Sequence, residues 1–177
     1  MVIGQGFSDR FLSEEEVRAI FQEALNSIDV TGQKLLVIIP DNTRSGPMPL
    51  CFRLLTELLL GRVAKLDFLI ALGTHMPMDE NKICRHLGIT PQQLHGQYAG
   101  VDIFNHNWEK GLREIGVISA AEIRELTDGL MEEDVRVQVN ERLFAYDRLI
   151  ICGPVFPHEI AGFSGGNKYF FPGVSGP

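Results

Sequence analysis

The sequence predicts an α/β fold, with a layered and mostly parallel sheet flanked by helices in a single domain. Short runs made up of apolar residues alternate along the chain with segments in which apolar residues recur at helical spacing. Wholly apolar runs are typical of parallel strands that are buried on both faces. The chain has 177 residues, of which 45% are hydrophobic and 22% are charged, as in an ordinary globular domain. We therefore expect residues 1–177 to form one domain.

The first half of the chain predicts helices and strands in alternation. Ser13 precedes three glutamates, which is the pattern of a capped helix with an acidic first turn. An apolar run then ends at Pro40, and the leucine-striped segment after it begins with proline and ends with glycine. After a second apolar run, Asp79 and Thr90 occupy positions typical of helix N-caps. The predicted elements are a helix over 13–26, a strand over 35–39, a helix over 49–61, a strand over 66–72, a helix over 79–87 and a short helix from residue 90.

The second half of the chain continues the alternation with shorter elements. Two further apolar runs read as strands, and the segment from Val135 to Val139 alternates as a half-buried strand does. Ser119 marks the start of a helix. The predicted elements are a strand over 101–104, a helix over 119–126, a strand over 135–139, a short helix over 141–146 and a buried strand over 149–152.

Charge and composition exclude several classes of partner. Sixteen basic and 23 acidic residues give a net charge of −7, and no block of like charges stands out. Non-specific binding to nucleic acid or to an acidic membrane needs a basic surface, so we expect neither. The first residues do not resemble a signal peptide, and no apolar run is long enough to span a bilayer. We expect a cytoplasmic protein whose three cysteines, Cys51, Cys84 and Cys152, are structural thiols without zinc spacing.

Polar residues follow three of the predicted strands at the points where they end. Asp41 and Arg44 follow the first, His75 follows the second, and His158 comes shortly after the last. If the strands are parallel, these side chains line one edge of the sheet, where ligands bind in α/β folds. Each also has a structural interpretation, as a turn cap, a surface arginine or a loop histidine. We assign His106 to structure and expect the remaining histidines, His86 and His95, to face solvent.

A glycine-rich loop near the end of the sequence surrounds a single lysine, Lys168. Gly162, Gly165 and Gly166 allow the backbone to approach a ligand closely, and their amides could cradle a phosphate. The spacing is neither that of a P-loop nor that of a dinucleotide fingerprint. Lys168 is therefore a candidate nucleophile or phosphate partner, and its alternative is a surface lysine in a flexible linker.

Three stretches together resemble the nickel-pincer lactate racemase family: "DNTRSGPMP", "ALGTHMPM" and "PHEIAGFSGGNKYFFPGVSG". They occur in that family's order, and the resemblance extends from about Leu35 to Pro177. It implies the N-terminal, cofactor-anchoring domain of a two-domain enzyme. We therefore expect the chain to be an excised domain or a natural truncation, with the C-terminal domain and the family's nickel-binding histidine beyond Pro177. No metal ligand is expected among the residues present.

The resemblance also assigns roles to individual residues. Lys168 matches the lysine that is joined to the cofactor, a nickel pyridinium bis-thiocarboxylate mononucleotide. His75 and His158 match the paired acid/base groups, and Arg44 matches the residue that holds the substrate carboxylate. The residues implied to contact the cofactor are Asp41, Asn42, Thr43, Arg44, Gly165, Gly166 and Lys168.

The implied activity is that of an isomerase, a racemase or epimerase of small 2-hydroxy acids that removes and returns a hydride. Hydride removal is easier than deprotonation beside a carboxylate because it yields a stable keto acid, and it needs an electron-accepting cofactor. Two histidines then serve the hydroxyl proton on either face of the substrate. We expect the isolated domain to be inactive, and a homo-oligomer is compatible with the sequence. The aromatic residues Phe170 and Phe171 could shape the pocket for another substrate.

Two other functions fit part of the pattern. Asp41, His75 and His158 could be the three ligands of a zinc hydrolase-like site, which would leave Lys168 without a role. Alternatively, the chain could be a non-catalytic, stand-alone binding domain that has the family's fold but not its activity.

Overall fold

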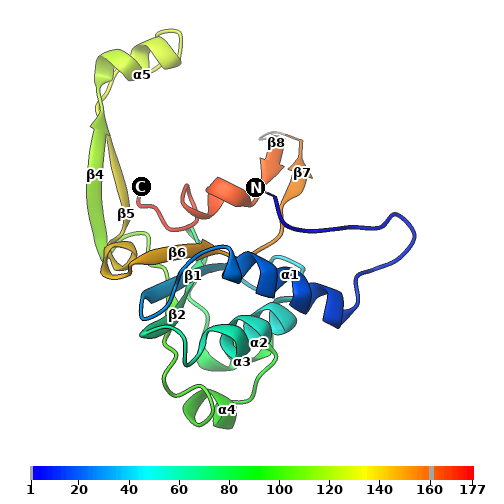
Figure 1. Cartoon of the computed structure of the whole chain (residues 1–177). Coiled ribbons are helices and arrows are strands. Elements are labelled where there is room, and N and C mark those ends of the chain that lie inside the picture. The colour runs from blue at the N-terminus through cyan, green and yellow to red at the C-terminus, as the bar shows by residue number, and fades with distance from the viewer. Residues whose placement is uncertain (1, 160–161) are drawn as a thin grey trace.

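Four parallel strands form the main sheet, in the order β3-β2-β1-β6 (Figure 1). The computed structural model describes residues 2–159 and 162–177. The central strand β1 pairs in parallel with β2 and β6, and β2 pairs in parallel with β3. The predicted α/β fold with a mostly parallel sheet in a single domain is therefore confirmed. The strands are β1 (Lys34–Pro40), β2 (Lys65–Ala71), β3 (Ile103–Asn105) and β6 (Arg148–Ile151).

Strand β1 is buried on both faces, as its apolar sequence requires. Leu35, Val37 and Ile39 belong to the core on the helical side of the sheet, and each is fully buried. Leu36 and Ile38 belong to a second core on the opposite face. Successive residues of a strand point to opposite faces, so a run without polar residues supplies both cores.

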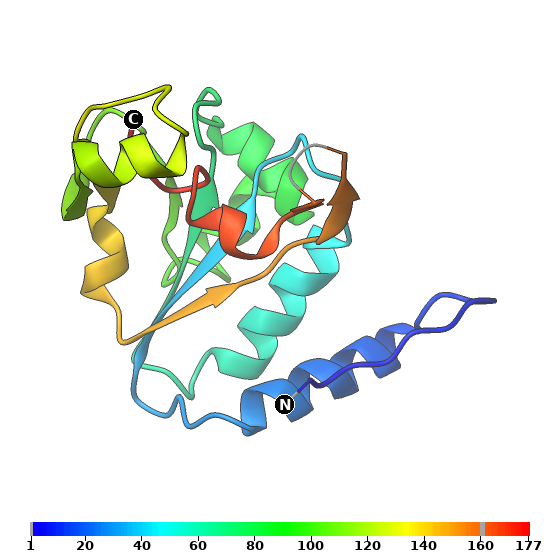
Figure 2. The ribbon, with the colours of Figure 1, turned by 90° about the horizontal axis from the view of Figure 1, so that it is seen from above.

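Helices cover one face of the sheet (Figure 2). The N-caps predicted for α1, α3 and α4 are confirmed, since the Ser13, Asp79 and Thr90 side chains each accept a backbone N–H bond. Within the described ranges no helix is both long and apolar enough to cross a membrane. The helices are α1 (Glu14–Asn26), α2 (Met48–Leu59), α3 (Glu80–Leu87) and α4 (Pro91–His95).

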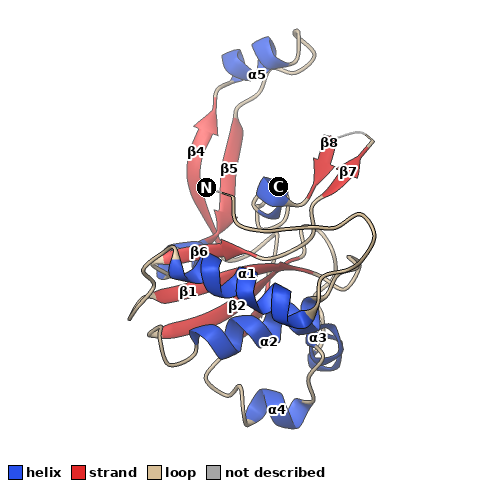
Figure 3. Cartoon of the chain, turned by 45° about the vertical axis from the view of Figure 1, so that its right-hand side comes forward, coloured by secondary structure: helices blue, strands red, loops and turns tan. Residues whose placement is uncertain are grey.

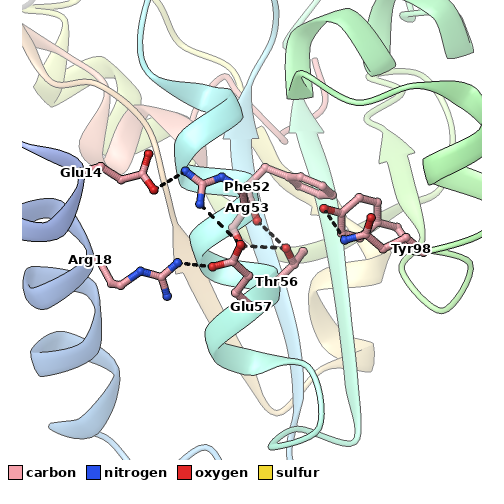
Figure 4. Close-up of polar contacts among 8 residues, drawn as sticks. Glu14, Arg18, Phe52, Arg53, Thr56, Glu57 and Tyr98 are labelled. Atoms are coloured by element: carbon pink, nitrogen blue, oxygen red, sulfur yellow. Dashed lines mark hydrogen bonds and ion pairs between the residues drawn. The ribbon is translucent and has the colours of Figure 1, made fainter.

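Ion pairs join α1 to α2 along their exposed side (Figure 4). Arg53 of α2 contacts Glu14 of α1 at 2.7 Å and Glu57 of its own helix at 3.5 Å, and Arg18 of α1 also pairs with Glu57. These pairs are half-exposed and add little individually. The apolar side chains that both helices contribute to the core, such as Leu25 of α1 and Leu55 of α2, stabilise the packing more than these pairs do.

The segment 112–140 forms an antiparallel arm that projects from the body (Figures 1 and 3). It consists of β4 (Leu112–Ile118), α5 (Ala120–Leu126) and β5 (Val135–Asn140). The helix was predicted, but β4 was not, and neither was the pairing of β5 with β4 outside the parallel sheet. Most of β4 is exposed, so no buried apolar run marks it. The short helix after β5 is a 3₁₀ turn, η1 (Glu141–Ala145).

The glycine-rich loop folds back over the carboxyl end of the sheet. It contains the short hairpin of β7 (Phe156–His158) and β8 (Gly162–Ser164), followed by the 3₁₀ turn η2 (Gly166–Tyr169). The hairpin was not predicted. Ile160 and Ala161, which belong to the third recognised stretch, lie outside the described residues. The loop is therefore a folded part of the domain and not a flexible linker, at least over its described residues.

Two histidines have structural roles. His106 is buried, and its ring nitrogens contact the Ser175 carbonyl oxygen and the Asn140 side-chain amide, each at 3.0 Å. This confirms the structural assignment of His106. The prediction that His86 faces solvent was wrong, because its ring bonds to the Pro40 carbonyl oxygen at 2.9 Å and is half-buried. His95 is exposed beside Glu80, as predicted.

The cysteines are free thiols, and only Cys84 is buried. Cys51 and Cys152 are partly buried and pack against the helical core. Although they are far apart in sequence, each thiol shifts the pKa of the other, so the two lie close together. Their proximity depends on the placement of α2 beside the end of β6, and it could not be predicted from the separation of the two cysteines in the sequence.

We predict that the domain loses stability as the pH falls below about 6.5, the ordinary pKa of histidine. Burial lowers the pKa values of His106 and His86, against the opposing effect of their hydrogen bonds to carbonyl oxygens. The unfolded chain then binds these protons first, so their contribution is present above pH 6.5 and is lost on acidification, by at most about 1.4 kcal/mol per pH unit for each proton. Urea unfolding at pH 7.5 and 5.5 measures the loss.

The matched variant is His106→Gln, which cannot titrate. It should start less stable at pH 7.5 but lose less stability between the two pH values than the wild type does. An identical pH dependence in both proteins would show that His106 is not a source of the effect.

Candidate active site

The polar residues that follow three neighbouring strands line one pocket of about 400 Å³. Because β1, β2 and β6 are parallel, their carboxyl ends lie at the same edge of the sheet, where ligands bind in open α/β folds. The β7–β8 hairpin and η2 lie above this edge (Figure 1). The polar side chains that line the pocket are those of Asp41, Thr43, Arg44, Ser45, Thr74, His75, His158, Ser164, Lys168 and Tyr169.

A carboxylate–histidine pair lies at the end of β1. One oxygen of the buried Asp41 carboxylate accepts hydrogen bonds from the Thr43 backbone N–H at 3.1 Å and from the Thr43 hydroxyl at 2.6 Å. Its other oxygen lies 2.6 Å from Nδ1 of His75. Burial opposes ionisation of Asp41, but the bonds from Thr43 and His75 outweigh it, so the pKa of Asp41 lies below its usual value.

The Asp41 carboxylate determines which nitrogen of His75 carries a proton. An ionised carboxylate only accepts hydrogen bonds, so Nδ1 of His75 must be the donor. In the neutral ring, Nε2 then carries a lone pair that can accept a proton. The His75 side chain is about half exposed, and it lines the pocket. The pair therefore presents an oriented general base to whatever the pocket binds.

Backbone hydrogen bonds hold the second half of the site against the first. The Gly73 N–H, just before His75, donates to the Gly173 carbonyl oxygen at 2.9 Å. The Lys168 N–H donates to the Gly165 carbonyl oxygen at 3.1 Å, and the Lys168 carbonyl accepts from Gly173 at 3.0 Å. Lys168 and the His75 loop are thus parts of one hydrogen-bonded structure.

Gly165 is required by the shape of the loop that carries Lys168. Its φ is +82°, in the region that side chains disfavour. A Cβ atom at this position would also overlap the Pro154 carbonyl oxygen. The close approach of the two backbone segments makes one wall of the pocket.

The charges that line the pocket favour an anion. Arg44 and Lys168 are cationic, whereas Asp41 is the single carboxylate among the described lining residues. Asp41 is already engaged by Thr43 and His75. A ligand with a carboxylate or a phosphate would therefore meet uncompensated positive charge, and an arginine can hold a carboxylate through two parallel hydrogen bonds.

The structure brings together seven of the nine residues that the sequence predicted for the site. Asp41, Thr43, Arg44, His75, His158, Gly165 and Lys168 line the pocket, whereas Asn42 and Gly166 do not. The expectation that Phe170 and Phe171 shape the pocket finds no support, since neither lines it.

Tyr169, the first aromatic after the lysine, lines the pocket but was not among the predicted site residues. Its adjacency to Lys168 was a signal. However, which of three consecutive aromatic residues faces the pocket depends on the 3₁₀ turn, and the sequence does not reveal that turn.

The zinc hypothesis requires three ligands close together. Over residues 2–159 and 162–177, no group of three or more His, Cys, Asp and Glu side chains is arranged to hold a metal ion. Asp41 and His75 do touch, but a pair is not the three-ligand set that zinc sites use. The zinc alternative is therefore not supported by the arrangement of the described residues.

Comparison with known families identifies one match over most of the chain. Residues 12–177 match the family model described as the lactate racemase N-terminal domain. None of the curated proteins matches this chain.

Two solved structures share the fold. The crystal structure of a protein from Thermotoga maritima is 30% identical with a TM-score of 0.81, and the match covers 93% of this chain and 39% of that one. The lactate racemase apoprotein from Thermoanaerobacterium thermosaccharolyticum is 22% identical with a TM-score of 0.68, and the match covers 93% of this chain and 37% of that one. This chain thus spans about two fifths of the length of each.

We predict that Gly165→Ala destabilises the domain by at least about 1 kcal/mol, because it adds a side chain at positive φ against the Pro154 carbonyl. The matched control is Gly116→Ala in β4, where a Cβ atom meets nothing within 4 Å and φ is not positive. Thermal unfolding of both variants measures the difference. Equal melting temperatures would contradict the role assigned to Gly165.

Proposed function

Because the chain belongs to the lactate racemase family, through its match to that family's N-terminal domain, we propose that it forms the acid/base and cofactor-anchoring part of an isomerase. The proposed reaction inverts C2 of a small 2-hydroxy acid. The observation that carries the proposal is the convergence of a carboxylate-oriented histidine, a second histidine, an arginine and a lysine on one pocket. Each of these groups has a distinct part in such a reaction.

The two histidines would handle the proton of the substrate hydroxyl. Nε2 of His75 is the nitrogen left free to accept it, because Nδ1 faces Asp41. His158 comes from β7 and also lines the pocket. Two bases on different structural elements suit a racemase, since the two enantiomers present their hydroxyl groups differently to one fixed carboxylate.

Arg44 would hold the substrate carboxylate. It follows Asp41 by three residues, and its backbone N–H donates to the Asp41 carbonyl at 3.3 Å. The turn that orients the Asp41–His75 pair therefore also places the arginine. A fixed carboxylate and a fixed base together define where C2 of the substrate lies.

The described residues fit the family's nickel-pincer nucleotide. Gly165 packs so closely against the Pro154 carbonyl that no side chain would fit there, and both Gly165 and Lys168 line the pocket. Lys168 would carry the covalent attachment, and backbone N–H groups of the glycine-rich loop could bind the phosphate of the mononucleotide. When bound, such a cofactor supplies the hydride acceptor and donor that side chains lack. The nickel ligand and the remaining walls of the site would come from a further part of the enzyme.

We predict that Lys168 carries a covalent adduct containing sulfur and phosphate in the full-length protein from a host that makes the pincer cofactor. Mass spectrometry of the peptide that contains Lys168 detects it, with a known family member analysed in parallel. Modification of that member's lysine without modification of Lys168 would contradict the cofactor proposal.

We predict that His75→Ala and His158→Ala each reduce racemisation of the substrate by at least about 100-fold, because each removes one acid/base group. The loaded full-length enzyme is assayed in both directions with each pure enantiomer. His95→Ala is the matched control, since His95 is exposed and pairs with Glu80 away from the pocket. Turnover at the wild-type rate in both site variants would refute the acid/base assignment.

A further inference from the structure

Tyr169 lies beside Lys168 and is mostly buried. Its exposed fraction is 7%, and its ring packs into the core on the face of the sheet opposite the helices. It also lines the pocket. Only a small part of the Tyr169 side chain is therefore exposed to the pocket.

The hydroxyl of Tyr169 lies at the carboxyl ends of β1 and β6. A Cβ atom on Gly153 would overlap this hydroxyl, and it would lie 3.0 Å from Cδ of Pro40. Gly153 follows β6 by two residues, and Pro40 is the last residue of β1. The absence of a side chain at position 153 therefore makes room for the hydroxyl, at the edge of the sheet where Asp41 begins the site.

This hydroxyl has no hydrogen-bond partner among the described residues, although a buried tyrosine hydroxyl normally has one. In the described part of the chain, every side-chain polar atom that is fully buried has a hydrogen-bond partner. Because the Tyr169 hydroxyl oxygen has none, this atom must be partly accessible to solvent. Since Tyr169 lines the pocket, the pocket is where a partner can reach it.

The partner that fits this hydroxyl is an acceptor brought by the ligand. Burial raises the pKa of Tyr169 to about 12, so the group remains a donor at physiological pH. Asp41 acts electrostatically on Tyr169, but its carboxylate is already bonded to Thr43 and His75. Arg44 is close enough to act electrostatically on Tyr169, and it also lines the pocket. A neutral donor beside a cation is a suitable pair for a carboxylate.

We infer that the Tyr169 hydroxyl donates a hydrogen bond to the carboxylate of the bound 2-hydroxy acid, alongside Arg44. The inference rests on the proposed function. Its effect is to add a hydrogen bond to a carboxylate oxygen from a direction other than that of the arginine, which further restrains rotation of the carboxylate about the bond to C2. Tyr169 is thus a substrate-positioning residue that moves no proton.

The test is Tyr169→Phe in the full-length protein, which keeps the ring and removes the donor. Because a hydrogen bond to a charged group is lost, we expect KM to rise by about 10- to 100-fold. Occupancy of Lys168 by cofactor and the melting temperature should stay as in the wild type. In cofactor-free protein, calorimetry with lactate, malate and mandelate should show a parallel loss of affinity for whichever acid the wild type binds. Arg44→Ala, analysed alongside, should weaken the same binding.

Tyr98→Phe is the matched control, since Tyr98 is a buried tyrosine in the core on the helical face, away from the pocket. Its KM and affinity should equal those of the wild type. An unchanged KM and affinity in Tyr169→Phe would overturn the inference while leaving the proposed racemase intact. A rise in KM that appears only with loss of cofactor from Lys168 would also overturn it. Failure of the wild type to bind any of the three acids would also overturn the inference about Tyr169. An unmodified Lys168 would instead count against the proposed function alone.

Discussion

The parallel pairing of β1 with both β2 and β6 is the constraint on which the site depends. In a parallel sheet the carboxyl ends of all strands meet at one edge. The register places Pro40 opposite Ala71, so Asp41 and the Gly73–His75 loop leave the sheet side by side. If β2 ran antiparallel to β1, its carboxyl end and His75 would lie at the far edge. Burial of β1 on both faces keeps this strand in the centre of the sheet, because neither face can be turned to solvent without exposing leucine and isoleucine.

Asp41 connects the stability of the fold to the chemistry of the site. Its carboxylate is buried, and a buried charge is tolerated only when it is well hydrogen-bonded. Thr43 satisfies one oxygen, and the other is left for His75. The protein thus stabilises a charge at the floor of the pocket and uses the same charge to orient a base. Nearby, the cations Arg44 and Lys168 give the pocket a character opposite to the overall charge of −7. Much of that negative charge lies on the arm, where residues 112–140 include three arginines and seven acidic residues.

The sequence allowed the fold and most of the pocket to be predicted, because both depend on local patterns. Apolar runs mark buried strands, and polar residues just after them mark the ligand-binding edge, so the positions of Asp41 and His75 followed from the fold. The arm did not follow, since β4 is largely exposed and has no buried stripe. The role of His86 did not follow either, because its carbonyl partner at Pro40 belongs to a different element. Which aromatic beside Lys168 faces the pocket depends on a 3₁₀ turn that packs against β1, a contact between segments far apart in sequence.

The backbone hydrogen bond between Gly73 and Gly173 has a consequence for protein engineering. It ties the loop that carries His75 to the segment after Lys168 through main-chain atoms, which no substitution other than proline at position 73 removes. Transplanting the lysine loop alone into another α/β scaffold would leave its carbonyl without this donor. The transplanted lysine would then have no fixed orientation relative to the histidine. A functional graft has to carry residues 72–75 together with 165–174, so the smallest portable unit of this site is discontinuous in the chain.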